Sequence, residues 1–424
     1  MTDALPPASA GPGPKPPRER IVALDCLRGF AVLGILLMNI QSFSMIGAAY
    51  ENPRAFGDLS GGNYVVWLLC HVLADQKFVS IFSMLFGAGV VLMAARREQA
   101  GVPAAALHYR RMAVLLVFGL MHAYLLWFGD ILTAYALCGM LIYPMRRLPP
   151  WLLIMFGSIV WTGPIVILSF FGVTLPFWPP DELRELLDEW APSAAAAAEE
   201  IAAYRGGWLA QMPQRAKLAV LLQTVVFALG TFWVAGGLMI LGMGLHKLGM
   251  FAAGWSRRTY AAIIAAGAAV GLPIVLYGVH WNEAAAWDGR YSMFFGSLYN
   301  YVGSLPLALG WVAALMWSCR SGRAPLLANA LAAVGRMALT NYLLQTVICT
   351  SLFYGHGLGL FCRVERVGQV VVVAGVWVLQ LIMSPLWLRR FEFGPVEWLW
   401  RRLSYAGEQP QLSTSRAPRR PQAL

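Results

Sequence analysis

Long runs of apolar residues, separated by short segments rich in Arg, constrain this chain more than any other feature. A helix needs about 20 apolar residues to cross the hydrocarbon core of a bilayer, and the runs at residues 21–43 and 367–388 reach that length. Only 12% of the residues are charged, against about 25% in a typical soluble domain. Continuous runs indicate helices and not the alternating strands of a barrel. The sequence therefore predicts an all-α polytopic integral membrane protein in contact with the lipid bilayer.

The apolar runs predict about ten transmembrane helices. They cover residues 21–43, 64–94, 112–128, 131–143, 151–173, 218–241, 260–279, 292–317, 333–354 and 367–388. The fourth is short, so it is expected to form a packed hairpin with the third. Basic residues gather in every second connection, which by the positive-inside rule places both the N-terminus and the C-terminus in the cytoplasm. This pattern indicates a bacterial inner (cytoplasmic) membrane protein.

The segments outside the spans divide the chain into three parts. Residues 1–17 and 406–424 are rich in Pro and are expected to be disordered cytoplasmic tails. Residues 18–405 form the transmembrane domain, in which residues 174–215 are a non-cytoplasmic loop with surface helices. The net charge is +11, but the basic residues lie at helix ends, so no nucleic-acid partner is expected. Neither a metal site nor a bound cofactor is predicted, because the six cysteines show no ligand spacing.

The first span carries charged residues within an apolar run. Asp25 and Arg28 are one turn apart, and Asn39 returns to the same face about four turns farther on. Ionisable groups in hydrocarbon are functional candidates because their burial is costly, so these three residues are predicted to bind a substrate or an acyl donor. The alternative is an internal Asp25–Arg28 ion pair that only anchors the helix in the bundle.

Two His–Asp combinations are candidate catalytic groups. His122 precedes Asp130 by one short connection, and His71 and Asp75 lie on one face of the second span. A His exchanges protons near neutral pH, and a carboxylate can orient it as a general base. Lys77 is expected to point away from Asp75 towards another helix, as a substrate ligand or as a structural partner of Asp25 or Asp130. For His122 the alternative is a core histidine without chemistry.

The ninth span opens with further polar candidates. Arg336 stands at its start and Asn341 continues a polar face inward. Arg336 is suited to binding a phosphate or carboxylate near the cytoplasmic face, and an interfacial anchor is the alternative.

Taken together, these segments resemble the YeiB-like family, also described by domain of unknown function 418, over about residues 20–405. The resemblance lies in Leu-Asp-Cys-Leu-Arg-Gly-Phe-Ala at residues 24–31 with Asn39, in residues 77–87 and 119–132, in Gly-Arg-Met-Ala-Leu-Thr-Asn-Tyr at residues 335–342, and in residues 391–401. Joint occurrence in this order is specific to the family, whose members are often labelled as transporters.

The opening motif is also similar to that of transmembrane acyltransferases of the heparan-glucosamine N-acetyltransferase type. This similarity implies an enzyme that moves an acyl group from cytoplasmic acyl-CoA to a small-molecule, sugar or lipid acceptor at or beyond the membrane. Those enzymes use a His just after the first span, whereas residues 45–62 here contain none. His122 or His71 would take that role. The alternative function is a transporter or flippase in which Asp25, Lys77, His122 and Asp130 form a charged relay, and a structural protein is a third reading.

Overall fold

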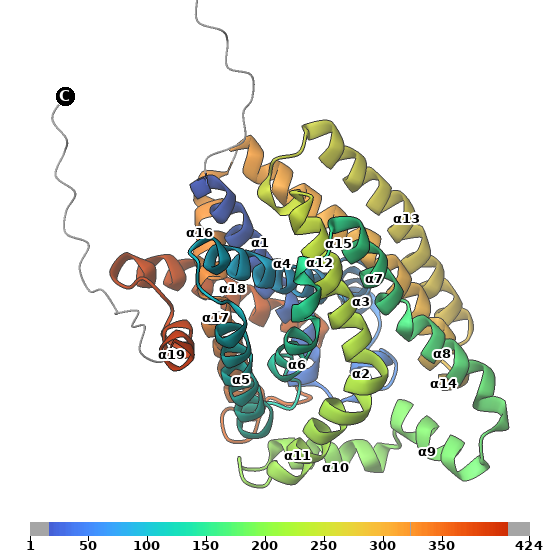
Figure 1. The fold of residues 1–424 in the computed structure, drawn as a ribbon. Coiled ribbons are helices and arrows are strands. Elements are labelled where there is room, and N and C mark those ends of the chain that lie inside the picture. Colours follow the sequence, from blue (N-terminus) through green and yellow to red (C-terminus); the bar gives the residue numbers. More distant parts are fainter. Residues whose placement is uncertain (1–16, 323, 406–424) are drawn as a thin grey trace, which may run out of the picture.

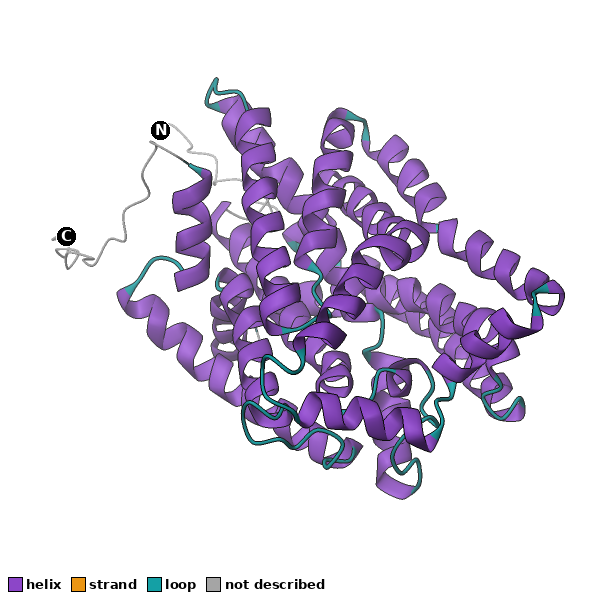
Figure 2. Ribbon diagram, turned by 90° about the horizontal axis from the view of Figure 1, so that it is seen from below, coloured by secondary structure: helices purple, strands orange, loops and turns teal. Residues whose placement is uncertain are grey.

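The described part of the chain, residues 17–322 and 324–405 of a computed structural model, consists of helices and connections without strands (Figure 2). Eight helical segments are long and apolar enough to cross a membrane, among them Val22–Ser44 and Gly61–Gln99. The protein is therefore an all-α polytopic membrane protein. The predicted tails at residues 1–17 and 406–424 lie outside the described residues, except for Pro17, which begins the first helix.

The helices follow one another with short connections (Figure 1). The first half contains α1 (Pro17–Ser44), α2 (Ala48–Glu51), α3 (Gly61–Leu73), α4 (Lys77–Gln99), α5 (Ala105–Met121), η1 (His122–Leu126), α6 (Leu132–Ile142), η2 (Tyr143–Arg147), α7 (Pro150–Trp161), α8 (Gly163–Thr174), η3 (Leu175–Phe177), α9 (Pro180–Trp190), α10 (Ala194–Arg205) and α11 (Met212–Leu221). The second half contains η4 (Leu222–Gly236), α12 (Gly237–Lys247), η5 (Met250–Ala252), α13 (Arg257–Ala284), α14 (Gly289–Tyr291), η6 (Ser292–Gly296), α15 (Ser297–Ser321), α16 (Pro325–Arg336), α17 (Ala338–Phe353), α18 (Arg366–Arg390) and α19 (Pro395–Ser404).

The fourth of the ten expected spans is as short as the sequence indicated, whereas the ninth is shorter. The run at residues 131–143 contains α6, which has 11 residues, and residues 127–131 before it are not helical. The run at 333–354 becomes α17, with 16 residues, because the chain breaks at Met337 and residues 333–336 end the separate helix α16. Non-helical backbone in a membrane domain is tolerated where protein and not lipid surrounds it.

The connections meet in two groups at opposite ends of the bundle. At the basic end, Arg146 binds Glu98, Lys247 donates to the carbonyl of Leu148, Arg320 to that of Trp255, and Arg110 to that of Ser404. At the other end, Glu200 accepts from the amide of Gly47, Trp190 donates to the carbonyl of Trp287, and Arg205 to that of Phe361. Figure 1 shows α9, α10 and α11 together at this second end, far from the start of α1. Residues 174–215 contain α9, α10 and the start of α11.

Glycines bring several helices into backbone contact. A Cβ on Gly335 of α16 would lie 1.8 Å from the carbonyl oxygen of Asp25, and one on Gly29 of α1 would lie 1.9 Å from that of Leu331. A Cβ on Gly87 of α4 would similarly meet the backbone of Met239 in α12. Small residues at crossings let membrane helices approach closely. These contacts hold α1 at the centre of the bundle, against α16 and α4.

Candidate functional site

His122 lies at the point where α5 passes into the π-helical turn η1. Its Nδ1 is 2.9 Å from Oδ1 of Asp130, and its Nε2 is 2.9 Å from Oγ1 of Thr346 in α17. The side chains of His122 and Asp130 are 0% and 1% exposed, and Thr346 is also buried. The predicted pairing of His122 with Asp130 is present, and a hydroxyl that sequence analysis did not identify completes a chain of three groups.

The local sequence explains how Asp130 reaches His122. The chain leaves the helix at Trp127, and Gly129 lies so close to the indole that a Cβ would be 2.4 Å from it. The other carboxylate oxygen, Oδ2 of Asp130, accepts a hydrogen bond from the amide of Thr133 at 2.7 Å and so caps the first turn of α6. On α5, a Cβ at Gly119 would lie 2.8 Å from that same oxygen, so only glycine leaves the carboxylate room.

The partners of His122 define its tautomer. An ionised carboxylate can only accept a hydrogen bond, so Nδ1 of His122 carries the hydrogen that bonds to Asp130. Nε2 is then the basic nitrogen and accepts the hydrogen of Thr346. This assignment follows from the hydrogen-bond network. A neutral imidazole held in this way presents its basic nitrogen to a hydroxyl, which is the arrangement of a general base with an orienting carboxylate.

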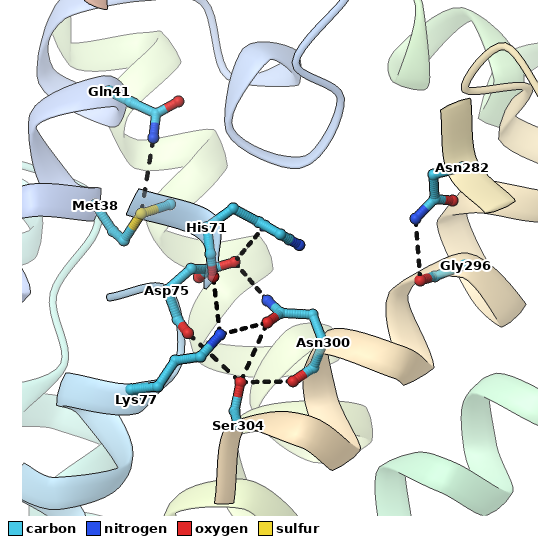
Figure 3. Close-up of polar contacts among 9 residues, drawn as sticks. All are labelled: Met38, Gln41, His71, Asp75, Lys77, Asn282, Gly296, Asn300 and Ser304. Atoms are coloured by element: carbon cyan, nitrogen blue, oxygen red, sulfur yellow. Dashed lines mark hydrogen bonds and ion pairs between the residues drawn. The ribbon is translucent and has the colours of Figure 1, made fainter. Parts of the chain in front are cut away.

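The second predicted pair, His71 and Asp75, belongs to a different network (Figure 3). Nδ1 of His71 lies 3.3 Å from Oδ2 of Asp75, which also accepts from Asn300 of α15 at 2.7 Å. Lys77 donates to Oδ1 of Asn300 at 2.6 Å and to the carbonyl of His71 at 2.8 Å. Ser304 adds a third contact to Asn300. Each of these polar side chains is hydrogen-bonded or ion-paired to another member of the cluster. This arrangement is more typical of a structural contact between helices than of a reaction site.

Lys77 binds a residue of another helix, as expected, but this residue is Asn300 of α15, and Lys77 lies in the same cluster as Asp75. The expected angle between Lys77 and Asp75 does not apply. It assumed one continuous helix over residues 64–94, whereas α3 ends at Leu73 and α4 begins at Lys77. Gln76, between them, has φ of 60°, in the left-handed region. This turn brings Lys77 back onto the His71–Asp75 cluster, so its partner is Asn300 and neither Asp25 nor Asp130.

Asp25 and Arg28 form the predicted ion pair in α1, with 3.1 Å between Oδ1 and Nη1. The side chain of Arg28 is 29% exposed and that of Asp25 is 11% exposed. Arg96 and Arg336 are close enough to interact electrostatically with Asp25, and Arg111 and Arg28 with each other. Positive charges therefore outnumber the Asp25 carboxylate at this end of α1. Arg28 of α1, Arg96 of α4, Arg111 of α5 and Arg336 of α16 are defined as the basic cluster.

Of the remaining predicted residues, Arg336 and Asn341 make structural contacts. Arg336 donates to the carbonyl of Glu392 at 3.0 Å. The amide of Asn341 donates to the carbonyl of Val334 and to Ser384, which ties the break between α16 and α17 to α18. Asn39 is half-buried, and its side chain makes no hydrogen bond to the residues that the structure describes.

Sequence analysis also missed the role of Glu397 in α19. Its carboxylate accepts the amide of Thr340 at 2.9 Å and the hydroxyl of Thr340 at 2.5 Å, so that it caps the start of α17. Burial raises the pKa of Glu397 above the usual value of 4.5, and the bonds from Thr340 act in the opposite direction.

The charged relay expected of a transporter is not continuous. Asp25 lies in the basic cluster, Lys77 in the network of Figure 3, and His122 with Asp130 in a third group. No hydrogen bond among the described residues connects these three groups to one another.

The chain is similar to a family of unknown function and to proteins that are themselves uncharacterised. The model of a family described as protein of unknown function (DUF418) matches residues 245–407. The uncharacterised protein YeiB of Escherichia coli (strain K12) is 34% identical, over 94% of this chain and 100% of its own length. YxaH of Bacillus subtilis (strain 168), also uncharacterised, is 30% identical over 92% and 96%.

A third relative, the uncharacterised 39.9 kDa protein in the amylase 3′ region of Bacillus acidopullulyticus, is 29% identical over 93% of this chain. No solved structure matches the chain significantly. The matches extend over nearly the whole length of the chain and of its relatives, as the motifs had indicated. The chain belongs to the YeiB-like, DUF418 family of membrane proteins.

Proposed function

We propose that this protein is an acyltransferase of the bacterial inner membrane that moves an acyl group from cytoplasmic acyl-CoA to an acceptor hydroxyl or amine. The observation that carries the proposal is the buried Asp130–His122–Thr346 chain, with 2.9 Å at both nitrogens of His122. Acyl transfer requires a base that takes a proton from the attacking group and returns one to the leaving group. His122 has the tautomer and the orienting carboxylate for both steps.

In the proposed reaction His122 Nε2 removes the proton of the attacking hydroxyl as its oxygen bonds to the thioester carbon. Collapse of the tetrahedral intermediate breaks the carbon–sulfur bond, and the imidazolium returns the proton to the CoA thiolate. Asp130 stabilises the imidazolium through Nδ1. Thr346 occupies the position of the attacking hydroxyl at Nε2, so the acyl group passes either to Thr346 first or directly to an acceptor that displaces it from the base.

The basic cluster at Arg28 is the proposed site of the donor. CoA carries phosphates, and Arg binds phosphate through two parallel hydrogen bonds. The Arg28 side chain is partly accessible beside Asp25, and Arg96 and Arg336 add positive charge. The cluster lies at the end of the bundle where the basic connections meet, which the positive-inside rule assigns to the cytoplasm.

The direct test is equilibrium binding of acetyl-CoA to detergent-purified protein. A variant with Asp25→Asn and Arg28→Gln removes both charges while it keeps a donor and an acceptor paired, so that no buried charge is left alone. We expect saturable binding in the wild type and at least tenfold weaker binding in the variant. The matched control is Arg184→Ala, which removes an exposed Arg at the opposite end and should bind normally. Equal binding by all three proteins, or none by the wild type, would contradict the donor site.

A further inference from the structure

The helix α19 lies at the edge of the bundle (Figure 1) and packs against α5 and α17. Residues 391–394 alone separate it from the membrane span α18. The carbonyl of Ser404 in α19 accepts from Arg110, and that of Glu392 just before it accepts from Arg336. Both of these Arg residues belong to the basic end, which the positive-inside rule assigns to the cytoplasm. The helix α19 therefore follows directly on a span at its cytoplasmic end.

One face of α19 is fixed to the bundle. Glu397 and Ser404 are buried, and at about 100° per residue they lie within roughly 20° of each other around the helix axis. The carboxylate of Glu397 accepts from the amide of Thr340 at 2.9 Å. The indole of Trp400 donates to the carbonyl of Arg111 at 3.0 Å. These contacts determine which side of α19 is turned away from the bundle.

The opposite face of α19 exposes apolar side chains. Leu399 and Leu403 are 41% and 49% exposed, and they lie one turn apart, at least about 100° around the axis from the buried face. On the preceding span α18, Ile382, Met383 and Leu386 are also exposed. Large exposed apolar surfaces of this kind mark contact with a membrane or with another protein. The two leucines thus add apolar surface just beyond the end of a lipid-facing helix.

Basic side chains without an acidic partner accompany this apolar face. Arg402 is exposed, and its guanidinium lies 5.3 Å from the ring of Trp398. Arg389 and Arg390, which end α18, are also exposed. None of these three Arg residues forms an ion pair with a residue in the described part of the chain. A free guanidinium binds phosphate through two parallel hydrogen bonds, and Trp is typical of the boundary between membrane and water.

We infer that α19 and the end of α18 form a docking surface for anionic phospholipids of the cytoplasmic leaflet. The two leucines contact the acyl chains, and the three Arg side chains bind the lipid phosphates. Basic helices with one apolar face lie in the plane of a membrane in this way. A soluble polyanion would satisfy the Arg residues but would leave the leucines in water. The inference concerns lipid binding alone and does not rest on the proposed acyl transfer.

The experiment measures lipid retention by native mass spectrometry of the detergent-purified protein. The probe is an equimolar mixture of dioleoyl phosphatidylglycerol and dioleoyl phosphatidylcholine, which have the same chains and differ in net charge. We expect roughly tenfold or greater preference for phosphatidylglycerol, because each Arg near an anionic surface contributes on the order of fivefold. Arg389→Gln combined with Arg402→Gln should lower this preference several-fold. Leu399→Gln combined with Leu403→Gln should lower retention of both lipids.

The matched control is Arg257→Gln combined with Arg258→Gln, which removes two exposed Arg residues from the start of α13, at the same end of the bundle. Its net charge changes by the same amount, and it should keep the preference of the wild type. Equal loss in both Arg variants would show attraction to net charge alone and would overturn the inference. Unchanged retention in the leucine variant would also overturn it. So would displacement of the bound lipid by millimolar glycerol 3-phosphate, which carries a phosphate without acyl chains.

Discussion

The imidazole of His122 is bound at both nitrogens, by Asp130 at Nδ1 and by Thr346 at Nε2. Asp130 has two tasks, because its second oxygen accepts from the amide of Thr133 at the start of α6. The orientation of the base is thus coupled to the position of a helix end. At this scale the sequence predicted the two titratable partners from their spacing. It did not predict Thr346, since a Thr in an apolar helix 224 residues away carries no local signal.

Glu397 provides a test of a single buried carboxylate outside the spans. Burial raises the pKa of Glu397 above 4.5, so the folded state favours the protonated carboxyl group. Its contribution to stability is present below pH 4.5 and is lost as the pH rises through its folded pKa. Glu397→Gln keeps a group that can accept from the amide of Thr340 and donate to its hydroxyl. We expect the apparent melting temperature of the variant, relative to wild type, to be higher at pH 8 than at pH 4.5.

The control for Glu397 is Glu392→Gln, at an exposed position in the same segment. Its melting temperature relative to wild type should be the same at both pH values. A difference between Glu397→Gln and wild type that does not change with pH would show that the carboxylate does not titrate in this window. The melting curves can be followed by intrinsic tryptophan fluorescence in detergent.

Among the secondary-structure elements, the crossing of α1 and α16 depends on glycine. A Cβ on Gly335 would lie 1.8 Å from the carbonyl oxygen of Asp25, and backbone cannot move away as a flexible side chain can. We expect Gly335→Ala to destabilise the protein by about 1–3 kcal/mol, as overpacking does elsewhere, and to weaken acetyl-CoA binding through the displaced Asp25–Arg28 pair. Thermal unfolding and the binding assay measure the two effects.

Gly375→Ala on α18 is the matched control, because a Cβ there meets nothing within 4 Å. It should leave the melting temperature unchanged or raise it slightly, since Ala is the better helix former by about 1 kcal/mol. If both substitutions had the same effect, the close crossing of α1 and α16 would not be important for stability.

The helix breaks mark where sequence analysis of the elements failed. Apolar runs predicted the positions of the spans, but the breaks at residues 74–76, 127–131 and 337 lie within or beside such runs. Each break is stabilised by a distant partner: Asn300 for Lys77, Thr346 for His122 and Ser384 for Asn341. Hydropathy measures how apolar a segment is, and it contains no information about these long-range contacts. The polar residues of the breaks were nevertheless recognisable as unusual in apolar surroundings.

In the whole molecule, the basic connections gather at one end and α9, α10 and α11 at the other (Figure 1). The alternation of basic residues predicted this two-ended arrangement from sequence alone. The proposed donor cluster at Arg28 belongs to the basic end.

The measurement that tests this account most directly is release of CoA from acetyl-CoA by protein reconstituted with lipids extracted from its native membrane. The account predicts release by the wild type and a loss of at least 100-fold in His122→Ala, the contribution typical of a general base. His356→Ala, which removes an exposed loop histidine, should match the wild type. Equal rates of CoA release by wild type and His122→Ala, or no release above the protein-free rate by either, would contradict the proposal that His122 is the base of an acyl transfer.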